Sequence, residues 1–151
     1  MSLRLEAGAH KFVTAVSHKP YDSLRELIEA LVALLEGRAR AGVRWNCEPD
    51  EFDLGFETRG GEVFIEVAHY PDHRRLAREV VFTTLQTESD LYSAFWRELR
   101  QLRRRTVTDE FEQNWRRAFP EDELRRFTKT FRAHRRRNNA AAAPAPPRES
   151  A

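Results

Sequence analysis

The chain has 151 residues, of which 40% are hydrophobic and 33% are charged, and its formal net charge is +2. This length suffices for one domain with a buried core, because such a chain buries roughly 70% of its unfolded surface. No apolar run approaches the roughly 20 residues of a membrane span, and because the first residues contain no apolar signal-like stretch, we expect no signal peptide. One cysteine permits neither an internal disulfide nor a thiolate metal cage. We therefore expect a cytoplasmic protein.

The charge is distributed unevenly along the chain. Residues 1–96 contain 11 Lys and Arg against 16 Asp and Glu, whereas residues 97–137 contain 14 against 7. An acidic N-terminal part is thus joined to a basic C-terminal part, which indicates partners of opposite charge. Arginine makes up 23 of the 26 basic residues, so codon composition is an alternative explanation for the basic part.

The first part of the chain predicts a strand at residues 10–17, with a further candidate strand at residues 3–6. Ser23 and Glu26 have the spacing of a capping box, in which the hydroxyl and the carboxylate bind free amides at a helix start. Leucine and isoleucine then recur at spacings of three and four up to Leu35, and Gly37 fits a C-terminal cap. The pattern predicts a helix that starts at Ser23.

Two runs of period-two alternation, at residues 52–58 and 62–68, flank Gly60-Gly61. They predict an antiparallel hairpin with one buried face. A short strand at residues 43–47 precedes this hairpin, and a strand at residues 79–85 follows it. Because the strands are grouped in sequence, we predict an α+β fold. It has an antiparallel sheet of four to five strands, with one helix from the N-terminal half and two to three C-terminal helices packed on it.

The C-terminal part predicts the remaining helices. One helix begins at Thr87, and a second begins at Thr108 and ends at Pro120. The last begins at Glu121, where acidic residues are favoured by the helix dipole. From residue 138 onward, the alanine- and proline-rich tract cannot build a core. We therefore predict a single domain at residues 1–137 and a disordered tail at residues 138–151.

Acidic side chains gather in and around the predicted hairpin. An enzyme would need two carboxylates in different environments, and no such difference is visible in the sequence. A solvated sheet face is one alternative. Charge complementarity would, however, speed and direct association with a basic protein, so we predict a partner-binding surface here. The predicted contact residues are Glu48, Asp50, Glu51, Asp53 and Glu57.

Arginine clusters in the C-terminal part indicate nucleic-acid binding as a second hypothesis, because clustered arginines contact phosphates in a salt-dependent way. No helix-turn-helix, zinc finger or RNA-recognition motif accompanies them. Helix-end solvation is the alternative explanation. The candidate contacts are Arg103, Arg104, Arg105, Arg135, Arg136 and Arg137.

A third hypothesis is a metal site or enzyme centre at His69, Asp72 and His73, which could supply three ligands. Pro71 excludes the helix that would bring the two imidazoles together, and a solvated turn is the alternative. No phosphate-binding loop, nucleophile elbow or dinucleotide fingerprint is present. We therefore expect no cofactor and favour a binding protein over an enzyme, with the oligomeric state left open.

One run of residues resembles a pattern in small bacterial α+β proteins. It reads Trp45-x-x-Glu48-Pro49-x-x-Phe52-x-Leu54-x-Phe56, followed by Gly60-Gly61-Glu62-Val63-Phe64-Ile65-Glu66-Val67. Some of those proteins resemble immunity proteins, which neutralise polymorphic toxins. The resemblance covers about residues 43–131 and carries no catalytic or binding motif, so no functional residue is transferred. It implies a stoichiometric inhibitor whose acidic face covers a basic toxin such as a nuclease.

Overall fold

The computed structural model of the chain describes residues 2–15, 21–106 and 116–142. It confirms the predicted α+β class, with one helix in the N-terminal half and two in the C-terminal part. In chain order, the elements are β1 (Ser2–Ala7), β2 (His10–Ala15), α1 (Ser23–Leu35), β3 (Arg40–Asn46), β4 (Glu51–Arg59), β5 (Glu62–Tyr70), β6 (Glu79–Thr87), α2 (Glu88–Thr106) and α4 (Glu121–Ala142). The strands form two antiparallel sheets: a four-stranded one of order β3-β4-β5-β6, and a separate β1–β2 hairpin.

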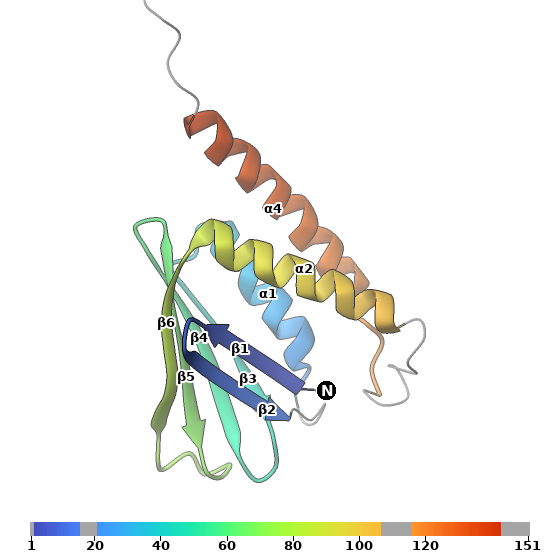
Figure 1. The fold of residues 1–151 in the computed structure, drawn as a ribbon. Coiled ribbons are helices and arrows are strands. Elements are labelled where there is room, and N and C mark those ends of the chain that lie inside the picture. Colours follow the sequence, from blue (N-terminus) through green and yellow to red (C-terminus); the bar gives the residue numbers. More distant parts are fainter. Residues whose placement is uncertain (1, 16–20, 107–115, 143–151) are drawn as a thin grey trace, which may run out of the picture.

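The helices cover one face of the four-stranded sheet (Figure 1). α1 packs against β3, α2 packs against β5 and β6, and α4 packs on α1 and α2. The β1–β2 hairpin lies on this same face, where the ring of Phe12 meets that of Phe52 at a centroid distance of 5.1 Å. Across the described ranges, no helix combines the length and apolar character needed to cross a membrane.

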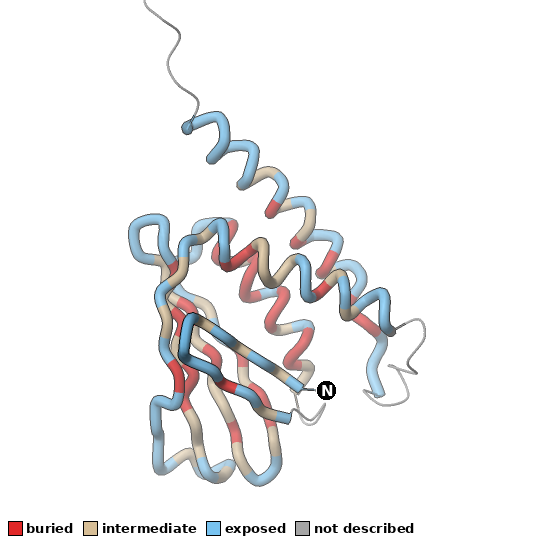
Figure 2. The backbone as a smooth tube through the Cα atoms, in the orientation of Figure 1, coloured by how far each residue is buried: buried red, intermediate tan, exposed pale blue. Residues whose placement is uncertain are grey.

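The β4–β5 hairpin follows the predicted alternation. Its register pairs Leu54 with Val67 and Phe56 with Ile65, and all four side chains are buried. Burying a side chain of this kind contributes about 1.5–3 kcal/mol. Figure 2 shows the buried segments where the sheet meets α1 and α2. The opposite face of the hairpin carries polar side chains.

The start of α1 differs from the capping-box prediction. Asp22 is the N-cap, and its carboxylate accepts a hydrogen bond from the Arg25 N–H at 3.5 Å. Ser23 is fully buried, and its hydroxyl donates to the carbonyl oxygen of Arg44 at 2.5 Å. The Glu26 carboxylate accepts a hydrogen bond from the backbone of Arg44. Because Asp22 already caps the helix, the two side chains bind the edge of β3 instead.

The C-terminal helices confirm some expectations and correct others. The Thr87 hydroxyl accepts from the Asp90 N–H at 3.2 Å and donates to its carboxylate at 2.8 Å, which confirms the helix start at Thr87. Most of the helix predicted from Thr108 lies outside the described residues, and residues 116–120 are not helical. α4 continues to Ala142, so residues 138–142, which we assigned to the tail, are helical. Alanine favours this extension because it has the highest helix propensity.

Candidate functional site

The sheet face that points away from the helices carries Glu51, Asp53 and Glu57, three of the predicted partner-binding residues. Arg75 reaches from the loop after β5 to both Glu51, at 2.8 Å, and Asp53. Its guanidinium also lies 3.6 Å from the centroid of the Tyr70 ring. Glu51 is only 5% exposed, so the alternative of a solvated sheet face is wrong for this residue.

Glu57 is paired with two arginines on the same face. Arg59 and Arg40 lie 3.2 and 3.3 Å from its carboxylate oxygens. Their hydrogen bonds lower the pKa of Glu57 below its ordinary value. This carboxylate therefore remains charged to lower pH and is already partly neutralised by the chain itself.

The remaining two acidic candidates lie in the turn between β3 and β4, and they also have partners. Asp50 lies 2.6 Å from Nε2 of His69, and Glu48 accepts a hydrogen bond from the Asn46 side-chain amide at 3.3 Å. All five predicted contact residues therefore interact within the chain. Binding of a basic protein to them stays a prediction, and such a partner would have to compete with these internal contacts.

The structure does not assemble a metal site at the predicted loop. The His69 ring, on β5, packs at 5.0 Å against that of Phe52, and Asp72 accepts a hydrogen bond from the Arg74 N–H. In the part of the chain that the structure describes, no three His, Cys, Asp or Glu side chains are grouped so that they could hold a metal ion. His69, Asp72 and His73 are therefore not arranged as the ligands of one metal ion.

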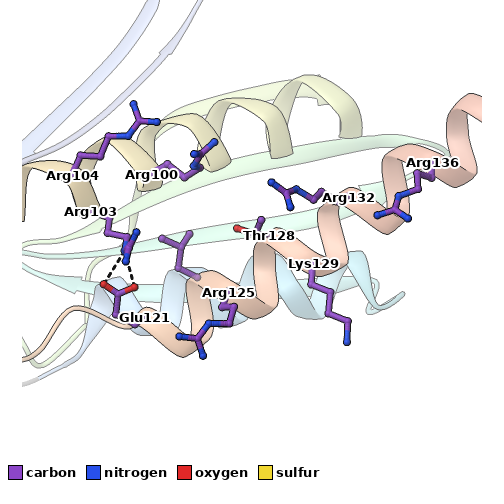
Figure 3. A pocket seen from close by; sticks show the side chains of 10 residues that line it. Arg100, Arg103, Arg104, Glu121, Arg125, Thr128, Lys129, Arg132 and Arg136 are labelled. Carbon is purple, nitrogen blue, oxygen red and sulfur yellow. Dashed lines mark hydrogen bonds and ion pairs between the residues drawn. The ribbon is translucent and has the colours of Figure 1, made fainter.

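A strongly basic groove lies between α2 and α4 (Figure 3). Its volume is about 440 Å³, and seven of its ten lining residues are cationic, whereas one is acidic. We refer to it as the basic groove. Its charged residues are Arg100, Arg103, Arg104, Glu121, Arg125, Lys129, Arg132 and Arg136.

The spacing of the cations along each helix explains why they share one groove. The three arginines of α2 stand three and one positions apart, and the four cations of α4 follow at intervals of four, three and four positions. Positions three or four apart lie on the same side of a helix. Since α2 and α4 pack side by side, residues of both stripes line one groove. In Figure 3, Arg132 points toward the space between the helices, whereas Arg125 and Lys129 point away from α2.

The six arginines predicted from the sequence are only partly brought together. Arg103, Arg104 and Arg136 line the basic groove. The other three lie elsewhere: Arg105 lines a cavity beside α1, Arg135 lies over the Phe131 ring, and Arg137 is exposed. Three consecutive helical residues point in three different directions, so an arginine triplet cannot face one groove. The three- and four-residue spacing was the better signal, and it identifies the four cations that we missed.

The groove cations differ in their partners. Nε of Arg103 contacts both carboxylate oxygens of Glu121, at 2.8 and 2.7 Å, and Arg125 pairs with Asp122 at 2.8 Å. Four others have no hydrogen-bond or ion-pair partner among the described residues: Arg104, Lys129, Arg132 and Arg136. Their charges are therefore available to an external anion.

Contacts between the two helices hold the floor of the basic groove. The indole N–H of Trp96 donates to the Thr128 hydroxyl at 3.2 Å, and its ring packs 5.9 Å from that of Phe131. The Arg100 guanidinium lies 4.6 Å from the Trp96 ring centroid. Leu124 is buried beneath the cations. These contacts fix the spacing of α2 and α4.

The chain was compared with protein-family models, with curated proteins and with solved structures, and no match was found in any of the three. The resemblance to immunity-like bacterial proteins therefore stays a prediction. The geometry of the chain's own residues is the basis for a functional proposal.

Proposed function

We propose that this protein binds the phosphate backbone of nucleic acid in the basic groove. One observation carries the proposal: seven cationic side chains and a single carboxylate line the groove, and four of the cations have no partner among the described residues. Like charges that line one groove repel one another, and an anion that enters relieves this repulsion. A polyanion with regularly spaced charges can contact several of these cations at once, with release of its counterions.

The chemistry of the groove supports phosphate recognition without base recognition. Six of its seven cations are arginines, whose planar guanidinium groups donate two parallel hydrogen bonds to phosphate oxygens. No aromatic side chain belongs to the lining in the described residues, so stacking platforms for bases are absent there. We therefore expect binding that depends little on nucleotide sequence.

The lining also favours nucleic acid over an acidic protein segment. Protein interfaces are anchored by aromatic and aliphatic side chains at a centre depleted of charge. In the basic groove, the apolar Leu124 is only 5% exposed and offers little surface to such an anchor. An acidic peptide is nevertheless a useful competitor in the test below.

This function was the second hypothesis from the sequence, and the pairing of charges supports it over the first. The carboxylates of the proposed acidic surface interact within the chain, whereas four cations of the basic groove do not. We also propose a cytoplasmic location, which the single free thiol of Cys47 supports.

Fluorescence polarisation with labelled duplex and single-stranded oligonucleotides tests the proposal. Contacts to four to seven phosphates predict that log K for duplex DNA falls linearly with log salt, with a slope of about −4 to −6. A flat salt dependence would contradict the proposal. So would tighter binding of a polyglutamate peptide than of either oligonucleotide, which would identify an acidic protein segment as the ligand.

A matched pair of double variants locates the binding site. Arg132→Gln with Arg136→Gln removes two groove cations. We expect the slope of log K against log salt to become less negative by about 2, and the affinity to fall about tenfold. Arg38→Gln with Arg74→Gln removes the same charge from exposed positions outside the groove, and it should change the affinity less than about threefold. Equal losses in the two double variants would place the binding elsewhere.

A further inference from the structure

The four-stranded sheet ends in an open edge at β6 (Figure 1). Among the described strands, β6 pairs with β5 only. The N–H of Glu88 bonds to the Gly61 carbonyl, and pairing alternates along an antiparallel ladder. The even-numbered residues from Phe82 to Gln86, on the regular side of the register shift, therefore bond to β5. Thr83, Leu85 and Thr87 direct their backbone N–H and C=O groups toward the open edge.

The opposite edge of the sheet is occupied by the chain itself. At β3, the side chains of Ser23 and Glu26 already bind the backbone of Arg44. α1 also packs along this strand, so the backbone groups of Arg44 are not free to pair with another strand. The sheet thus has one closed edge and one open edge, so pairing through β6 would end at two copies rather than grow into a filament.

Apart from a register shift near its start, the open edge lacks the protection that edge strands usually carry. Residues 80–87 include no charged residue, proline or glycine, and they are rich in β-branched residues. Val80, Val81 and Leu85 are 43%, 40% and 47% exposed. The register shift of β6 against β5 lies opposite Val67 and Ala68, which leaves residues 82–87 regular and able to pair.

We propose that the open edge of β6 binds a second copy of this chain. Antiparallel pairing about a two-fold axis near Leu85 stays within the regular residues 82–87. It would bring the exposed Leu85 of each copy beside that of the other, and Thr83 of one copy beside Thr87 of the other. The uncharged segment offers no repulsion to an identical segment. The result is a symmetric dimer with a continuous eight-stranded sheet.

The proposed dimer does not depend on nucleic-acid binding, but dimerisation would affect such binding. The two-fold axis of such a pairing is perpendicular to the sheet, so the helices of both copies lie on the same face. Both basic grooves would then face the same side. If they bind nucleic acid, the dimer would bind it at two sites, which raises the apparent affinity without new contacts.

Sedimentation velocity of the full chain over a concentration series, without nucleic acid, tests the proposal. We expect a concentration-dependent species of twice the 17.7 kDa chain mass. Thr83→Pro removes an edge-facing N–H but no bond to β5, and Leu85→Lys places a charge at the edge. Each should weaken dimerisation at least about tenfold. Ala39→Lys, in the exposed turn before β3 at the other edge of the sheet, adds the same charge and should have no effect.

Three outcomes would overturn the proposal. The first is a chain that remains monomeric at all concentrations. The second is a dimer that persists unchanged in both edge variants, which would place the interface elsewhere. The third is growth into larger assemblies, since the β3 edge is closed. Circular dichroism establishes that the variants are folded, and Leu85→Lys alone decides the question if the proline variant does not fold.

Discussion

The Ser23 hydroxyl lies 2.5 Å from the carbonyl oxygen of Arg44, and this hydrogen bond joins the first turn of α1 to the outer edge of β3. One turn further along the helix, the Glu26 carboxylate accepts a hydrogen bond from the backbone of the same arginine. Leaving a buried polar group without a partner costs about 1–3 kcal/mol. These two contacts therefore fix the position of α1 on the sheet and close its β3 edge.

Replacing Ser23 by alanine should lower the free energy of unfolding by about 1–2 kcal/mol, because it leaves the Arg44 carbonyl without this donor. Urea unfolding measures the loss as a lower midpoint at an unchanged slope. Ser89→Ala is the matched control, since Ser89 is exposed in the first turn of α2. Similar losses at the two serines would show that the bond to Arg44 contributes little.

The contribution of Glu26 should depend on pH. Burial raises the pKa of its carboxyl above the ordinary 4.5. The native state then binds this proton more tightly than the unfolded state, so the stability that Glu26 contributes falls as the pH rises from 4.5 through the raised pKa. Glu26→Gln keeps an acceptor for the Arg44 backbone and is never charged. We therefore expect the variant to gain stability relative to the wild type over this pH range.

Urea unfolding at several pH values on both sides of that range measures this gain. Glu29→Gln, on the exposed side of the same helix, controls for the loss of a negative charge. The gain in the free energy of unfolding of Glu26→Gln over the wild type should grow with rising pH. A gain that stays constant or shrinks would contradict the expected effect of burial.

Local periodicity explains which parts of the fold could be predicted from the sequence. The β4–β5 hairpin alternates within a few residues, and the leucines of α1 recur every three or four, so both patterns are complete within one element. The roles of Ser23 and Glu26 were not predictable in this way. Their partner, Arg44, is 21 residues from Ser23, and the same pair of side chains would equally suit a capping box.

The candidate sites depended still more on tertiary contacts. Arg75 is separated from Glu51 by 24 residues, so no local pattern could indicate that the acidic strand face is neutralised from the following loop. The cationic stripes of α2 and α4 are visible in the sequence as spacings of three and four. Their meeting in one groove follows from the packing of Trp96 on Thr128, which lie 32 residues apart.

Removing the cation beside the buried Glu51 should be costly. Arg75→Gln leaves that carboxylate, which is only 5% exposed, without its 2.8 Å partner, and we expect a loss of about 2–3 kcal/mol in the free energy of unfolding. Arg75→Gln combined with Glu51→Gln should recover much of this loss, because no uncompensated charge then remains buried. Urea unfolding of the three proteins measures the coupling between the two residues.

Arg78→Gln is the control for this prediction, because Arg78 pairs with Glu66 on the exposed part of the same face. Arg78→Gln should lower the free energy of unfolding by less than about 1 kcal/mol, as is usual for exposed ion pairs. If Arg75→Gln cost no more than Arg78→Gln, burial of Glu51 would not make its partner essential. The acidic face would then be more open to a basic protein than its internal pairs suggest.

The hydrogen bond between Trp96 and Thr128 should matter for the basic groove as well as for stability. Thr128→Val keeps the shape of the side chain but removes the acceptor of the indole N–H, which should cost about 1 kcal/mol. Thr130→Val is the control, because the Thr130 hydroxyl donates to the Arg126 carbonyl within α4 itself. Since the Trp96 contact sets the spacing of the two cationic stripes, Thr128→Val should also weaken oligonucleotide binding several-fold more than Thr130→Val does. Equal affinities of the two folded variants, measured by polarisation at one salt concentration, would show that binding tolerates a change in the spacing of α2 and α4.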